Sequence, residues 1–91
     1  MLLQSMTMNT EAQLRALKQS LERFGATDPC PWELASTFNL LLEEAKKEAS
    51  GNPVVAAMEP AQSGPDAVYA TMNAGALTGL TLQLYRALSR D

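Results

Sequence analysis

The chain has 91 residues, a formal net charge of −3 and a hydrophobic content of 46%. This length allows one domain with a modest core, which association with a second chain can complete. The acidic balance argues against a dedicated nucleic-acid binder and against a polybasic membrane-surface module, because both usually carry a basic surface.

Residues 1–9 have no basic region and no long apolar core, so they predict a flexible tail and not a signal peptide. A cytoplasmic protein is the default expectation. Thr10 and Gln13 have the spacing of a capping box, which predicts a helix over residues 10–24. Gly25 is expected to end that helix as a left-handed cap. An apolar seam at spacings of three and four runs along this segment: Leu14, Leu17, Leu21 and Phe24.

A proline-containing connector leads to the clearest helical pattern of the chain, over residues 31–49, where Pro31 suits the first turn. One arc of this helix is apolar, namely Leu34, Ala35, Phe38, Leu41, Leu42, Ala45 and Ala49. Leu40 stands alone on the polar side. Trp32 falls off the apolar arc, so it either packs the connector onto the bundle or is an exposed anchor for a partner.

Residues 53–58 are short and apolar, and are either a short helix with Pro53 in its first turn or an extended segment. The helix is favoured. Residues 59–65 have the composition of a loop and separate this segment from the last helix. Residues 10–91 therefore form a single helical domain.

The last helix is expected over residues 66–90, with Asp66 as its N-cap. Residues 67–85 carry no formal charge, and their apolar arc is broad: Tyr69, Ala76, Leu77, Leu80, Leu84, Ala87 and Leu88. Residues 80–85 alternate as a strand does, but no second strand is evident, so a helix is favoured. Asn73, Gln83 and the threonines interrupt the segment, which argues against a membrane span.

Gly75 and Gly79 are four residues apart and therefore lie on one side of this helix, where another backbone could approach closely. Four explanations remain open: a helix contact within the chain, a kink near the glycines, a self-association face, or a membrane dimerisation motif. For self-association we expect the interface to include six residues: Met72, Gly75, Gly79, Leu80, Leu84 and Trp32. Gly79→Leu should then disrupt the close crossing.

Candidate chemistry is sparse, because the sequence contains no histidine and one cysteine, Cys30. Cys30 precedes a helix N-terminus, which could lower the pKa of its thiol, although a small connector residue explains it as well. Glu43, Glu44 and Glu48 could bind a hard metal, but lysines surround them on a face expected to be solvated. We therefore predict no catalytic residues, no metal and no cofactor.

Together these patterns predict an all-α fold, a small bundle of three main helices that dimerisation completes. The predicted function is a non-enzymatic protein–protein interaction module (regulatory, adaptor or assembly factor) that acts as a cytoplasmic homodimer, without nucleic-acid or membrane partners. The alternative is a module that senses or binds a small apolar ligand in a pocket between the helices, lined by Trp32, Phe38, Met58 and Met72. A helix-turn-helix regulator is disfavoured because the connector is long and proline-rich and the next helix is acidic.

Overall fold

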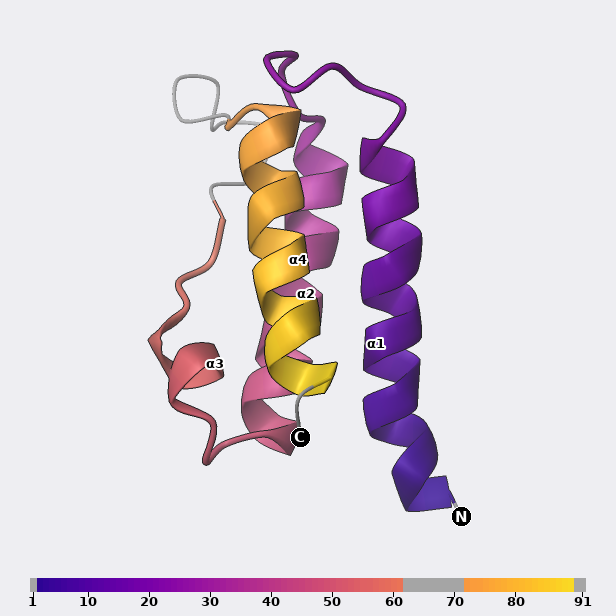
Figure 1. Cartoon of the computed structure of the whole chain (residues 1–91), viewed down its shortest axis with the longest axis vertical. Helices are drawn as coiled ribbons and strands as arrows, with labels where there is room; N and C mark the ends of the chain where they lie inside the picture. Colours follow the sequence, from indigo (N-terminus) through magenta and orange to yellow (C-terminus); the bar gives the residue numbers. More distant parts are fainter. Residues whose placement is uncertain (1, 62–71, 90–91) are drawn as a thin grey trace.

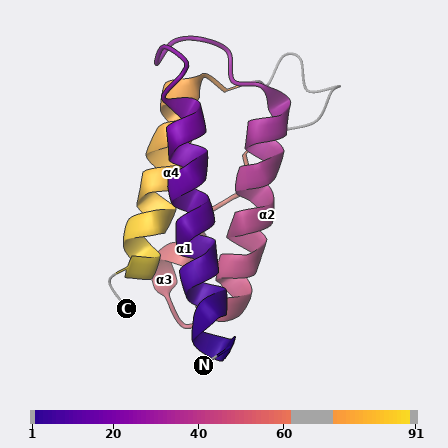
Figure 2. The ribbon, with the colours of Figure 1, turned by 90° about the vertical axis from the view of Figure 1, so that its right-hand side faces the viewer.

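The computed structural model describes residues 2–61 and 72–89, with side chains from Thr10 onward, and all four of its elements are helices. Helix α1 spans Leu2–Leu21, α2 Trp32–Glu48, α3 Pro53–Ala57 and α4 Ala74–Ser89. The long helices α1, α2 and α4 form a bundle in which α1 runs antiparallel to the other two (Figure 1). α1 lies across the seam between α2 and α4 (Figure 2). The prediction of a small all-α bundle is confirmed.

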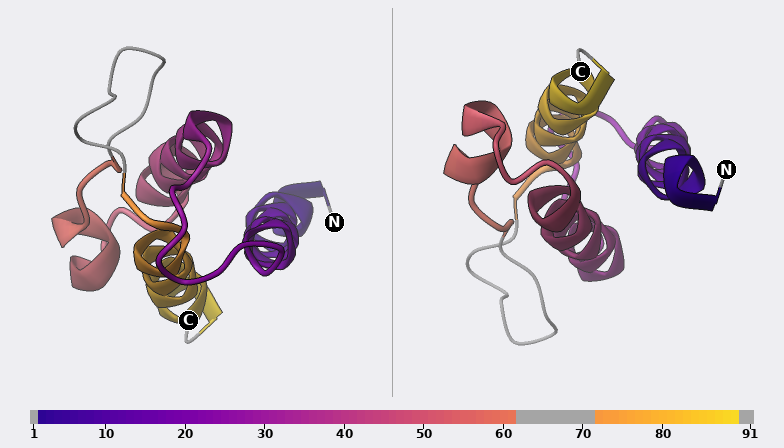
Figure 3. Two further views of the ribbon diagram at one scale, coloured as in Figure 1. Left: turned by 90° about the horizontal axis from the view of Figure 1, so that it is seen from above. Right: turned by 90° about the horizontal axis from the view of Figure 1, so that it is seen from below.

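The short helix α3 packs against α2 and α4 at the side away from α1 (Figure 3). Viewed along the bundle, α4 has α1, α2 and α3 on three of its sides, and no described helix on the fourth (Figure 3). This arrangement determines which side of α4 can meet another molecule.

The predicted helix bounds are close for α2 and α3 and differ for α1 and α4. α1 begins at Leu2 and not at Thr10, so residues 2–9 belong to the helix. Thr10 is therefore not an N-cap; it is buried inside α1, and its hydroxyl lies 3.4 Å from Oε1 of Glu48 on α2. α1 ends at Leu21, so Phe24 follows the helix and packs half-buried against the core. The predicted N-cap Asp66 lies outside the described residues.

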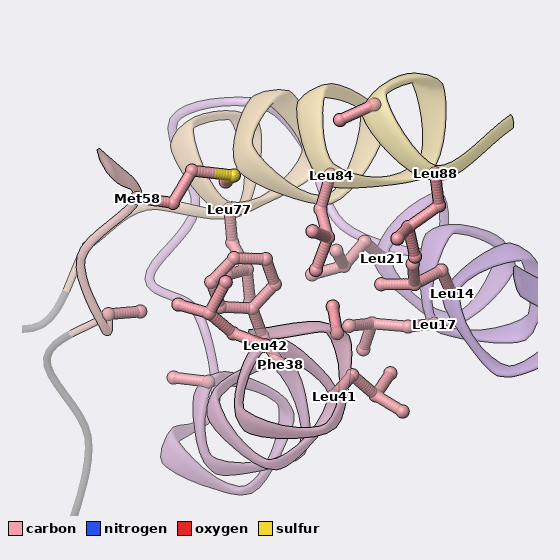
Figure 4. Packing of buried hydrophobic residues seen from close by; sticks show 14 of the residues in the cluster. Leu14, Leu17, Leu21, Phe38, Leu41, Leu42, Met58, Leu77, Leu84 and Leu88 are labelled. Carbon is pink, nitrogen blue, oxygen red and sulfur yellow. The ribbon is translucent and has the colours of Figure 1, made fainter. Parts of the chain in front are cut away.

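The core lies where the three long helices and α3 meet (Figure 4). Phe38 of α2 is at its centre, with 0% of its surface exposed. The predicted apolar arcs supply most of its other large side chains: Leu14, Leu17, Leu21, Leu41, Leu42, Leu77, Leu84 and Leu88. Leu40 is 65% exposed, as its place on the polar side of α2 predicts.

α4 is helical throughout Ala74–Ser89, so the strand alternative for residues 80–85 is wrong. Two positions on its wheel also differ from the prediction. Ala76 is exposed although it was placed on the core arc. Thr81 is buried instead, and its hydroxyl donates to the carbonyl of Leu77 at 2.8 Å, which satisfies the polar group inside the core.

The connector between α1 and α2, residues 22–31, crosses the beginning of α4. The amide of Ala74 donates to the carbonyl of Asp28, and the amide of Gly75 donates to the carbonyl of Ala26, each at 2.9 Å. The carboxamide of Asn73 accepts from the amide of Ala76 at 2.8 Å and is the cap of the helix. The first amides of α4, which have no partner inside the helix, are thus satisfied by the connector and by Asn73.

This crossing also explains the conformation of the connector itself. Gly25 does not have the left-handed conformation that was predicted. Its amide donates instead to the carboxylate of Asp28 at 2.8 Å, within the turn that follows α1. An isolated antiparallel bridge joins Pro29 to Asn73. The sequence predicted that Asn73 would lie inside the last helix, but in the structure it lies in this bridge, directly before α4.

Two asparagine side chains fasten the α3 segment to the bundle. Asn39 of α2 donates to the carbonyl of Ala61 at 2.8 Å and accepts from its amide at 2.6 Å. Asn52 caps α3 through the amides of Val54 and Val55, and its amide group donates to the carbonyl of Ala87 on α4 at 3.2 Å. Because these bonds tie backbone on both sides of α3, they fix its position against α4.

Candidate interaction surface

The two glycines of α4 have different surroundings, although they lie on the same side of the helix. A Cβ atom built on Gly75 would lie 2.9 Å from the carbonyl oxygen of Ala26 and 3.0 Å from its Cβ. A Cβ atom on Gly79 would meet nothing within 4 Å. Gly75 therefore serves a close contact with the connector inside the chain, whereas Gly79 faces open space.

Gly79 lies at the edge of a groove of about 760 Å³ between α4 and the segment that joins α2 to α3. We call this the first groove. On α4 it is lined by Gly79, Leu82, Gln83, Arg86 and Ala87, and opposite by Ala49, Gly51, Asn52, Pro53 and Val54. We use the name outer face of α4 for the exposed or half-exposed residues of this helix that line the first groove, namely Gly79, Leu82, Gln83 and Arg86.

Two further grooves adjoin the first. The second groove, of about 230 Å³, lies between α1 and α4 and shares Leu82 with the first. The third, of about 510 Å³, lies between α3 and α4, and shares Pro53, Val54 and Gln83 with the first. The outer face thus lies between a groove on the α1 side of α4 and a groove on its α3 side.

Exposed apolar groups gather on the α3 side of this surface. Val54 is 44% exposed and lines both the first and the third groove. Pro53 and Ala57 beside it are exposed, and Leu80 is half-buried. Pro53 and Val54 line the same groove as Gly79, so apolar side chains lie opposite a position of α4 from which no side chain projects.

The charged residues of the three grooves are all basic. Arg86 lines the first groove, and Arg15 and Lys18 line the second. Among the described residues, no aspartate or glutamate lines any of the three. This is unexpected for a chain with 10 acidic and 7 basic residues, and it means that the surface around the outer face differs in charge from the molecule as a whole.

The three cations have different partners. Lys18 forms an ion pair with Glu22, which directly follows α1, at 2.7 Å. Arg15 donates to the hydroxyl of Tyr85 at 2.8 Å and lies 5.6 Å from the centre of its ring. The hydrogen bond to Tyr85 raises the pKa of Arg15, and the carboxylate of Glu11 adds to this effect. Within the described part of the chain, Arg86 has no ion-pair partner.

The six residues of the predicted interface do not form one surface. Gly79 and Leu80 border the grooves, but Leu84 is 0% exposed and lies in the core, where it cannot meet a second molecule. Met72 precedes α4, and its carbonyl accepts from the amide of Cys30 at 3.1 Å. Trp32 is 43% exposed on α2, away from the grooves. The structure thus brings together only Gly79 and Leu80 of this set.

Several residues of the first groove were missed by sequence reasoning, among them Val54, Leu82 and Arg86. Leu82 and Arg86 stand three and seven residues after Gly79, so a helical wheel centred on that glycine could have found them. Val54 has no such signal, because its place opposite α4 depends on the turn at residues 49–52.

None of the three grooves is lined by Trp32, Phe38, Met58 and Met72 together, the residues of the pocket that the sequence suggested. Phe38 and Met58 are buried in the core, at 0% and 6% exposure, while Trp32 lies on the surface. Met58 reaches one edge of the third groove only.

The other candidate groups show structural roles. The side chain of Cys30 is buried, and burial raises the pKa of its thiol, opposite to the effect predicted from its place before a helix. Glu44 pairs with Lys47 at 3.7 Å. Within residues 2–61 and 72–89, no cluster of acidic or cysteine side chains could hold a metal ion. No helix in these ranges has both the length and the apolarity to cross a membrane.

Comparisons with known proteins give no relative. No protein-family model matches the sequence, and neither the curated proteins nor the solved structures contain a significant match.

Proposed function

We propose that this chain is a non-enzymatic interaction module that acts by contact through the outer face of α4. The observation that carries the proposal is Gly79: it has open space where a Cβ would stand, and it lines a groove whose walls include the apolar side chains of Val54 and Leu82. A helix needs no glycine at an open position, where alanine would be favoured by about 1 kcal/mol. A partner that packs closely against α4 does need a residue without a side chain there.

The non-enzymatic part of the proposal is supported by chemistry. The sequence has no histidine, and the thiol of Cys30 is buried. The residues around the outer face are apolar, basic or neutral polar, and they provide no nucleophile paired with a base.

A homodimer is the form of this proposal that the sequence itself suggests. In it, α4 of one copy would cross α4 of the other at Gly79, an isologous contact. The basic residues around the grooves work against a large contact of this kind, because each copy would bring Arg86 and Arg15 toward those of the other. The homodimer is therefore restricted to a short crossing centred on Gly79.

The experiment that tests the homodimer is the solution mass by light scattering after size exclusion, over a dilution series. Wild type is compared with Gly79→Leu, which places a side chain in the groove. Ala16→Leu is the matched control, because Ala16 is exposed on α1 and lines none of the three grooves. A dimer that Gly79→Leu converts to a folded monomer, and that Ala16→Leu leaves intact, supports the homodimer. A monomer at every concentration rejects it and leaves a different protein as the partner.

A further inference from the structure

We infer that the outer face of α4 binds an amphipathic helix of another protein, with apolar anchors on one side and acidic residues beside them. The inference rests on the proposed function, because it names the partner of the same face. Three properties of the surface lead to it: its shape, its length along α4 and its charge.

The shape favours a helix as the occupant. α4 already has helices on three sides, and a fourth helix against Gly79 would complete the packing around it (Figure 3). Helix axes normally pack 8–10 Å apart, and small residues at the crossing allow the closer distances. The described residues contain no strand with a free edge, so a partner cannot add to a sheet here.

The length fits a short helix. The first groove follows α4 from Gly79 to Ala87, a distance of about 12 Å at 1.5 Å per residue. Anchors at i, i+4 and i+7 of a partner helix span about 10 Å. Two to three turns would therefore place apolar side chains against Leu82 and Val54, which line the first groove.

The charge selects the acidic class of helix. Arg86 lines the first groove and Arg15 the second, beside apolar residues. Lys18 is paired with Glu22, and Glu22 lines none of the grooves. Carboxylates on a bound helix would meet these guanidinium groups, and lysines in the same places would be repelled. A second copy of this chain brings more cations to the contact, which is why a different protein is the favoured occupant.

The test uses a displayed library of helices and the full chain as the target. Each helix has about 14 residues, with leucine at i, i+4 and i+7, and Glu or Lys at equal frequency at the flanking positions. The library is sorted separately on wild type and on Gly79→Leu. We expect clones that bind wild type and not Gly79→Leu, with Glu several times more frequent than Lys at the flanks.

Selected peptides are then titrated against two charge variants. Arg86→Glu should weaken binding by about tenfold or more, and higher salt should weaken the wild-type complex. Arg23→Glu makes the same charge change at an exposed residue that lines none of the grooves, and should have little effect.

Each other outcome overturns the inference in a recognisable way. Selection of Lys-rich or charge-indifferent helices that still require Gly79 rejects the acidic partner and keeps the proposed function. Glu-rich helices that bind Gly79→Leu equally well place the binding elsewhere. No selection, together with a Gly79-dependent dimer in light scattering, assigns the face to a second copy. No selection together with a monomer removes the proposed function as well.

Discussion

The two glycines of α4 allow a paired test of how the connector is held. Gly75→Ala and Gly79→Ala make the same chemical change four residues apart in one helix. Alanine is favoured over glycine in a helix interior by about 1 kcal/mol. If only helix propensity mattered, both variants would be more stable than wild type.

The structure predicts opposite signs. At Gly75 the added methyl would lie 2.9 Å from the carbonyl oxygen of Ala26, where ordinary contact begins at 3.4 Å, so the connector must move by about 0.5 Å. That carbonyl accepts the amide of Gly75, and the next bond in the same turn joins Ala74 to Asp28, each at 2.9 Å. Overpacking of this kind costs about 1–3 kcal/mol, and the propensity gain is small in the first turn of a helix. We expect Gly75→Ala to lose about 1–2 kcal/mol.

At Gly79 nothing lies within 4 Å of the new methyl. Gly79→Ala should therefore gain about 0.5–1 kcal/mol from propensity alone. The two variants should differ by about 2 kcal/mol, which corresponds to roughly 8–16 °C in melting temperature for a domain of this size.

The assay is urea and thermal unfolding followed by far-UV circular dichroism, at several protein concentrations so that self-association can be separated from folding. Equal m-values would show that the variants unfold from comparable states. If Gly75→Ala were as stable as Gly79→Ala, the close approach of the connector to α4 would not exist in solution, and the account of how α4 begins would be refuted.

Three further predictions concern single side chains. Phe38→Ala should lose about 3–5 kcal/mol in urea unfolding, because the ring is fully buried; a loss below 1 kcal/mol would place Phe38 outside the core. Asn39→Ala should lose about 1–3 kcal/mol in the same assay, because it leaves the amide and carbonyl of Ala61 without their partner. The thiol of Cys30 should react with a disulfide reagent only as fast as the protein unfolds. The difference in free energy of unfolding between wild type and Cys30→Ala should be constant below pH 9.0, the ordinary pKa of a thiol. Above this pH wild type should lose stability relative to Cys30→Ala, because the unfolded chain loses a proton that the folded chain retains.

Local sequence patterns predicted the parts of the fold that local physics determines. α2 was located almost to the residue, because Pro31 favours its start, Asn52 and Pro53 follow its end, and its apolar arc is continuous. The capping pattern at Thr10 led to a wrong helix start, because such a pattern is local and takes no account of the residues before it. It marks where a helix can start, yet residues 2–9 contain no glycine or proline to prevent the helix from starting earlier.

The start of α4 could not be predicted from local pattern. It depends on hydrogen bonds between the connector and residues 72–75, which are more than 40 positions apart in the chain. Gly75 and Gly79 look alike on a helical wheel, and only the passage of Ala26 over one of them makes them different. The candidate surface has the same origin, because Val54 reaches it through the turn before α3.

Gly79 separates a structural explanation of the outer face from a functional one. If a residue serves stability, changing it should destabilise the protein. We expect this of Gly75, because the connector leaves no room there for a Cβ. Gly79 has no such requirement within the described chain, so alanine there should improve folding. If a partner helix packs on this face, the methyl group of Gly79→Ala should also weaken binding of the partner, because the methyl would lie between the two closely packed backbones. Stability and binding should then change in opposite directions at Gly79. A variant that gains stability and keeps full binding would show that this glycine has no part in the contact.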